Sequence, residues 1–183
     1  FTPRQAGRIA QRLVEIETYR VMALLAFPVA KEVGRLVSRA EDELADLMDG
    51  IGGSRTAEDD RAVLGRLSRL AAEVERSVAR TTFRFGAAAA YYRLVRQRID
   101  DLREQRLPGF SPIGEFMDRR LVPAIDTCAS IARRQADLSD RIARNSQLLR
   151  TRVDVEIERQ NQELLAQMNR RAKIQLHLQE TVE

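Results

Sequence analysis

The sequence predicts an all-α protein, an elongated antiparallel three-helix bundle or coiled coil with an overhanging long C-terminal helix. Apolar residues recur at steps of three and four through three long segments, which is the spacing of one helical face. Two short stretches rich in glycine or proline separate these segments. Charged residues make up 32% of the chain and aromatic residues only 5%, a balance that suits bundles with a narrow core. No segment shows the alternating pattern of a β-strand.

The first helix is expected over about residues 3–49. Thr2 is placed to cap this helix, Pro3 takes its first position, and Gln5 completes a capping box. Pro28 lacks a backbone donor, so we expect a kink there rather than an end. The helix gives way to the clearest loop of the chain, which reads "GIGGSRT".

The second helix is expected over about residues 57–105. Thr56 is placed to cap it, with Asp59 three residues further on. The stretch "RLPGFSP" ends the helix. Its apolar face extends over about seven heptads. The face consists of Val63, Leu67, Leu70, Val74, Val78, Thr81, Phe85, Ala88, Tyr92, Val95, Ile99 and Leu102.

The third helix is expected over about residues 112–182, with Ser111 as its cap and Pro112 in its first turn. A second kink, with a short helix before it, is expected at Pro123. Beyond Pro123 the segment contains no glycine or proline, and polar residues such as Gln135 lie on its apolar face. Such polar residues cost stability but can fix the register of a coiled coil.

This third helix exceeds the other two by roughly 20 residues, or ~30 Å. The overhang comprises about residues 161–182, and its apolar side chains have no intrachain partner in a three-helix bundle. They therefore predict a homo-oligomer or a neighbouring segment that covers them. The predicted self-association residues are Leu164, Met168, Ile174 and Leu178.

The sequence contains few candidates for catalytic or metal-binding residues. No nucleophile stands beside a base, so the chain is not expected to be an enzyme, and no cofactor or small-molecule substrate is indicated. His177, the only histidine, has no convergent partners in "QLHLQE", and Cys128 fits a buried inert thiol. Acidic residues flank the first loop and would bind a divalent cation loosely, or form a solvated tip. The speculative metal ligands are Asp42, Asp46, Asp49 and Asp59.

The basic residues are spread along the chain. The 31 Lys and Arg residues nearly balance the 27 Asp and Glu residues, leaving a net charge of +4. Ion pairs on a solvated helix surface explain this composition better than a nucleic-acid interface, so no nucleic-acid partner is expected. Arg170, Arg171 and Lys173 are either ordinary surface charges or the juxtamembrane basic residues of a cytoplasmic flank.

Four blocks of sequence carry a family resemblance. They read "FTPRQAGRIAQRLVEIETYRVMALL", "FRFGAAAAYYRLVRQRIDDLRE", "PGF…GEFMDRRLVPAIDTC" and "LLRTRVDVEIERQNQELLAQMNRRAKIQLHLQETVE". Together they resemble a bacterial family of unknown function whose members are described as predicted membrane-anchored proteins. The resemblance implies a region before Phe1 and a hydrophobic stretch after Glu183 that enters the bacterial inner membrane, with this chain on the cytoplasmic side. This layout is similar to CorA-type magnesium transporters in architecture only.

These observations leave two hypotheses for the function. The first is a non-catalytic helical stalk and oligomerisation domain of a membrane-anchored bacterial protein of unknown function. The alternative is a soluble coiled-coil adaptor that binds a partner protein through the same exposed apolar stripe. The chain is expected to form a single stalk-like domain and to be part of a longer protein.

Overall fold

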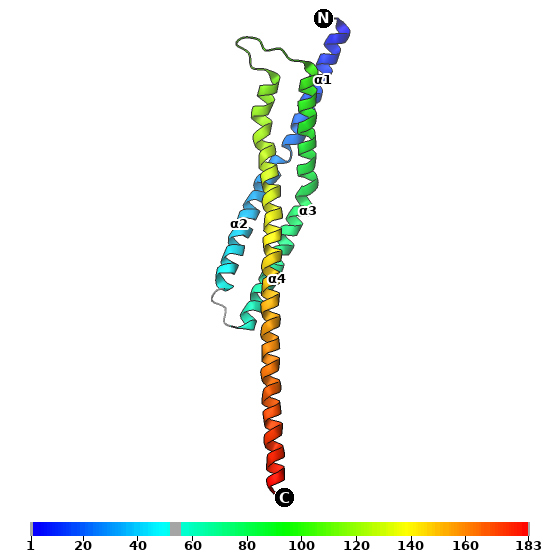
Figure 1. Cartoon of the computed structure of the whole chain (residues 1–183). Coiled ribbons are helices and arrows are strands. Elements are labelled where there is room, and N and C mark those ends of the chain that lie inside the picture. Colours follow the sequence, from blue (N-terminus) through cyan, green and yellow to red (C-terminus); the bar gives the residue numbers. More distant parts are fainter. Residues whose placement is uncertain (1, 52–55, 183) are drawn as a thin grey trace. The chain divides into compact units, whose positions relative to one another are not determined.

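The computed structural model describes residues 2–51 and 56–182, with side chains described for residues 2–50, 56 and 58–173. The helices are α1 (Pro3–Leu24), α2 (Phe27–Ile51), α3 (Ala57–Leu102) and α4 (Ile113–Val182) (Figure 1). None of these described residues forms a strand. The predicted all-α class is therefore confirmed.

The start of α1 follows the predicted capping box. The Thr2 backbone N–H donates to Gln5 Oε1 at 2.8 Å, and the Gln5 N–H donates to Thr2 Oγ1 at 3.3 Å. Pro3 takes the first helical position, where a missing N–H costs nothing. The two reciprocal bonds satisfy donors that the first turn of a helix leaves without partners.

The prediction of one continuous first helix is wrong, because α1 ends at Leu24 and α2 begins at Phe27. Pro28 has no N–H to donate to the Leu24 carbonyl, and its ring would collide with that carbonyl in a continuous helix. The chain makes a turn over two residues instead. Ala26 in that turn is only 1% exposed, so the break lies within the packed interior.

The effect of Pro123 is smaller than expected, because this residue lies inside the uninterrupted helix α4. No separate short helix precedes it within the described chain, and that part of the prediction is wrong. A single proline removes one backbone hydrogen bond of the helix. The neighbouring bonds persist, and the Thr127 hydroxyl donates to the Pro123 carbonyl at 2.6 Å.

The connection between α3 and α4 differs from the predicted one in its cap. Ser111 does not cap α4; its hydroxyl instead accepts a bond from Arg119 at 2.5 Å. The Glu104 carboxylate takes this role from the preceding loop, accepting bonds from the N–H groups of Ile113 at 2.6 Å and Gly114 at 3.3 Å. A carboxylate at a helix N-terminus also meets the positive end of the helix dipole.

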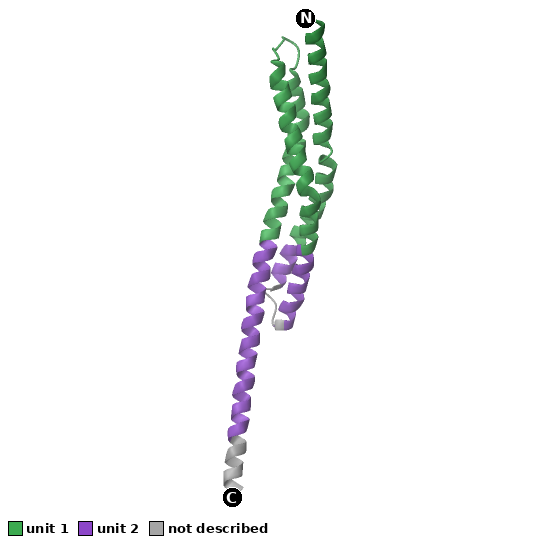
Figure 2. Cartoon of the chain, turned by 90° about the vertical axis from the view of Figure 1, so that its right-hand side faces the viewer, with its two compact units in different colours: residues 1–43, 72–140 green, residues 44–71, 141–183 purple. Residues whose placement is uncertain are grey.

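The chain divides into two compact units, coloured separately in Figure 2. Unit 1 comprises residues 1–43 and 72–140, and unit 2 comprises residues 44–71 and 141–183. Helices α2, α3 and α4 each contribute residues to both units. The expectation of a single domain stays a prediction.

In unit 1, one core cluster joins α1, α3 and α4. Its buried members are Ile16, Ala23, Val95, Ile99, Met117 and Leu121. Beside it the rings of Tyr19 and Tyr91 stack with their centroids 6.0 Å apart. Ala88 on the apolar face of α3 is also buried, at 1% exposed. An ion pair between Arg98 Nε and Glu15 Oε2, 2.7 Å long, joins α3 to α1 at the edge of this cluster.

In unit 2, the described parts of α2, α3 and α4 bury a second apolar core. Its buried apolar members are Leu44, Leu47, Leu67, Leu70, Ile142, Leu149 and Val153. Asp60, which is 5% exposed, makes an ion pair of 3.4 Å with Arg152 of α4. Thr56 and Asp59 form the predicted cap, because the Asp59 N–H donates to Thr56 Oγ1 at 3.1 Å and the Thr56 N–H donates back to Asp59 Oδ2 at 3.2 Å.

An α-helix that crosses a membrane must be long and of low polarity. Among the residues that the structure describes, no helix combines sufficient length with sufficient apolar character to span a bilayer.

Candidate interaction surfaces

The described C-terminal part of α4 exposes its side chains on every face of the helix. Val153, at 7% exposed, is the last buried residue of the described part of α4. We call residues 154–173 the distal α4 segment. From Glu158 to Lys173 every residue is exposed, whatever its polarity. The segment therefore lacks the division into a buried and a solvated face that the rest of α4 shows.

Large apolar side chains lie on this segment. Leu164, Leu165 and Met168 are 57%, 60% and 66% exposed. Ile157, one turn beyond the last buried residue, is half-buried. Exposed apolar side chains gathered on one helix mark a surface that binds another helix or protein.

The charges of the distal α4 segment are segregated along its length. Residues 154–163 carry four acids, Asp154, Glu156, Glu158 and Glu163, and one base. Residues 164–173 carry three bases and no acid. The single base of the first half, Arg159, makes ion pairs with Glu156 at 2.8 Å and with Glu163 at 2.9 Å. The hydrogen bond from Arg159 lowers the pKa of Glu156, so this half is acidic at neutral pH.

Only part of the predicted self-association set can be placed. Leu164 and Met168 are exposed, as the overhang hypothesis requires. The side chains of Ile174 and Leu178, and that of His177, lie outside the described side chains. The predicted juxtamembrane bases Arg170, Arg171 and Lys173 are all exposed on α4.

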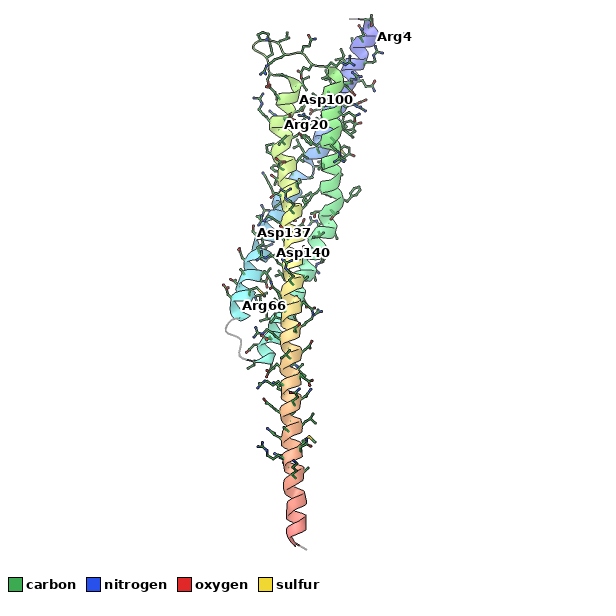
Figure 3. The ribbon with its side chains drawn as sticks, in the orientation of Figure 1. Arg4, Arg20, Arg66, Asp100, Asp137 and Asp140 are labelled. Carbon is green, nitrogen blue, oxygen red and sulfur yellow. The ribbon has the colours of Figure 1, made fainter. Side chains whose placement is uncertain are left out.

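A second surface is an apolar groove between α3 and α4 in unit 1, with a volume of about 450 Å³. Small residues line both sides of the groove, Gly86 and Ala89 on α3 and Ala129, Ala132 and Ala136 on α4. They leave room for a narrow ligand. Its lining includes two acids, Glu75 and Asp140, and no base. Asp140 is labelled with Asp137, one turn before it on α4, in Figure 3.

A polar network crosses the floor of this groove. Gln135, which is 2% exposed, donates from Nε2 to Ser77 Oγ at 2.8 Å and accepts at Oε1 from the Thr81 hydroxyl at 3.2 Å. The sequence placed Gln135 on the apolar face of its helix, and the structure confirms that position. Because both ends of the amide are bonded, the network holds α3 and α4 in one register.

Cys128 also lines the groove. Burial raises the pKa of its thiol, which keeps it protonated at neutral pH. A protonated thiol is a poor nucleophile, as expected for the inert buried cysteine that the sequence predicted.

The acidic residues near the first loop do not come together. No three His, Cys, Asp or Glu residues within the described parts of the chain form a group that could hold a metal ion. Asp42, Asp46 and Asp49 are exposed on α2, and the Asp59 carboxylate is bonded to the Thr56 hydroxyl at 2.7 Å. The cap therefore accounts for Asp59 without a cation.

A family model described as "Protein of unknown function (DUF3422)" matches residues 1–183. The chain belongs to this family. The resemblance to a family of unknown function is thereby confirmed over the whole chain. Neither a curated protein nor a solved structure matches the chain. Because the function of the family is unknown, membership assigns no activity to any residue of this chain.

Sequence reasoning missed the groove between α3 and α4. The signal was present in Ala129, Ala132 and Ala136, which recur at steps of three and four on α4. Small residues at this spacing are typical of a face that another backbone approaches closely. The apolar pattern indicated which faces of α3 and α4 are buried, but the width of the gap between them depends on how the helices pack.

Proposed function

We propose that this chain is a non-catalytic helical stalk that joins copies of a membrane-anchored bacterial protein through the distal α4 segment. The observation that carries the proposal is the exposure of Leu164, Leu165 and Met168 on a helix whose preceding turns are packed. Apolar side chains on one helix gain free energy when a second helix covers them.

The basic end of the distal α4 segment supports the membrane part of the proposal. Arg170, Arg171 and Lys173 lie within four residues, with no acid from residue 164 onward in the segment. Such clusters flank membrane spans on the cytoplasmic side and favour anionic headgroups. The chain would then stand at the cytoplasmic face of the inner membrane, with a CorA-like order of long helices before the membrane.

The groove between α3 and α4 favours a second candidate function, a soluble adaptor. An apolar groove with small side chains and an acidic rim would accept an amphipathic helix with basic residues. In that case the partner would be another protein, and loss of the α4 surface would not affect its binding.

The test of the stalk proposal is self-association measured by sedimentation equilibrium. Leu164→Asp combined with Met168→Asp should abolish association, because charges would replace the exposed apolar surface. The matched control is Val155→Asp, at a residue that is 64% exposed on the opposite side of the same helix. Equal association of both variants and the unmodified chain would place the contact elsewhere.

The membrane proposal has its own test in the full-length protein. Cell fractionation followed by alkaline extraction should leave the full-length protein in the membrane pellet. Its release into the soluble fraction would contradict the anchor and favour the adaptor.

A further inference from the structure

We infer that two copies of the chain pair their distal α4 segments in parallel and in register, with the Asn161 side chains of the two copies facing each other. This inference rests on the proposed function and adds the orientation and the register of the contact. It follows from the position of Asn161 among the apolar side chains of the segment, and from the side of the helix on which the charged residues stand.

The contact face is defined by four positions at steps of three and four, which is the spacing of a coiled-coil seam. We call this set the α4 seam. It consists of Ile157, Asn161, Leu164 and Met168. At about 100° per residue these side chains fall within a band about 60° wide. Within the single chain Ile157 is half-buried and the other three are exposed, so the α4 seam is open to a second copy.

The charges of residues 159–170 stand away from the α4 seam. Arg159, Glu163 and Arg170 are the charged residues of this stretch, and at about 100° per residue all three project from the far side of the helix. The residues that flank the seam here are uncharged, namely Gln160, Leu165 and Gln167. Flanking charges often set the orientation of a coiled coil. Because these flanks carry none, the residues of the seam itself set the orientation.

Asn161 decides the orientation. In a parallel pair in register, the two Asn161 side chains lie in one layer, and each amide can donate to and accept from the other. In an antiparallel pair centred on the α4 seam, Asn161 of each copy would face Leu164 of the other. Both amides would then be covered by apolar side chains without a hydrogen-bond partner, which costs free energy in two layers. A single asparagine in the seam of a parallel coiled coil fixes its register in this way.

Asp154 and Arg171 continue the same spacing beyond the two ends of the α4 seam and oppose this orientation. In the parallel pair Asp154 faces Asp154 of the second copy, and Arg171 faces Arg171, so like charges meet at each end. Both residues are exposed, where water and salt screen their charges and charge pairs contribute little to affinity. An unpaired amide inside the contact has no such screening. The Asn161 layer therefore outweighs the two end layers.

A parallel pair also suits a membrane-anchored stalk. Its two α4 helices run in the same direction, so both C-terminal ends point towards one membrane. An antiparallel pair would direct these ends apart, and two copies anchored in one membrane could not form it.

Disulfide trapping tests the orientation in the whole chain. In a Cys128→Ala background, which removes the only thiol, Ile157→Cys and Met168→Cys are each oxidised alone. Each variant should form a disulfide-linked dimer, because a parallel pair in register brings identical seam positions within reach of a disulfide. The matched control is Ala166→Cys, an exposed position on the opposite side of the same helix, which should not cross-link.

The outcomes separate the orientation from the proposed function. In an antiparallel pair the two copies of Ile157, or of Met168, would stand about 16 Å apart along the helix axis. A dimer that forms only when the two cysteine variants are mixed would therefore overturn the parallel pairing and leave self-association intact. A chain that associates but gives no cross-link at these positions would overturn the α4 seam. A chain that stays monomeric would overturn the proposed function itself.

The end layers give a second, independent readout. Arg171→Gln removes the two arginines that face each other in the parallel pair, so at low ionic strength it should strengthen self-association by about two- to fivefold. Sedimentation equilibrium measures the association constant. The matched control is Arg170→Gln, at the neighbouring exposed base on the far side of the helix, which should leave the constant nearly unchanged. An antiparallel pair would lose an attraction to Asp154 through Arg171→Gln, so an unchanged or lower constant would overturn the parallel pairing.

Discussion

Arg103 is the first residue after α3 and adopts a left-handed backbone conformation, with a φ of 51°. The Cβ atom of an L-residue is crowded in this conformation, whereas glycine adopts it without penalty. Helices commonly end with glycine at this position. An arginine at this position stores strain at the end of α3. This strain was not predicted, because the helix was expected to continue to about residue 105.

Replacing Arg103 with glycine is therefore expected to stabilise the protein by about 1 kcal/mol. The melting temperature should rise by about 2–4 °C for a chain of this length. The control is Arg93→Gly, an exposed residue inside α3, which should lose about 1 kcal/mol. Urea unfolding measures the free energy of unfolding of both variants. A loss of stability in Arg103→Gly would show that the arginine side chain makes a contact that stabilises the protein by more than the strain destabilises it.

At the scale of secondary structure, helix starts were more predictable than helix breaks. Thr2 and Thr56 cap their helices as predicted, because capping depends on residues three apart in sequence. Pro28 and Pro123 look alike locally, yet one separates two helices and the other lies inside a helix. The difference lies in tertiary packing, such as the buried turn around Ala26, which local pattern does not encode.

The cap of α4 gives a prediction at this scale. Glu104→Ala should destabilise the protein by about 0.5–2 kcal/mol, because the N–H groups of Ile113 and Gly114 lose their acceptor. The neighbouring exposed Gln105→Ala is the matched control and should change stability by less than about 0.5 kcal/mol. Equal free energies of unfolding for the two variants would contradict the capping role.

The contact of α1 with α3 predicts a pH dependence. Hydrogen bonds from Gln11 and Arg98 lower the pKa of Glu15 below its ordinary value of 4.5. A carboxyl group with a lowered folded-state pKa stabilises the fold above its unfolded pKa, and this contribution is lost as the pH falls through the folded value. The free energy of unfolding should therefore decrease as the pH is lowered below about 4.5.

Glu15→Gln should lose less stability than the unmodified protein over the same acid range, measured by urea unfolding at a series of pH values. Glu73→Gln changes an exposed carboxyl on α3 and serves as the control. If the Glu15 variant follows the same pH profile as the unmodified protein, the ion pair with Arg98 does not contribute.

At the scale of the molecule, the all-α class and the apolar helix faces could be predicted from the sequence, because both depend on the spacing of residues along one helix. The exposed Leu164 and Met168 were also foreseen, from helix lengths alone. The groove was not, because its lining comes from residues about 50 apart in sequence, such as Thr81 and Gln135. Contacts between helices depend on packing geometry that periodicity leaves open.

A distal α4 segment that joins copies of this chain must make the chain self-associate in solution. The most direct test is the solution mass of the unmodified chain by sedimentation equilibrium, from micromolar concentration to about 0.5 mM. The mass should rise with concentration from that of one chain towards that of two. A mass of one chain over the whole range would contradict it.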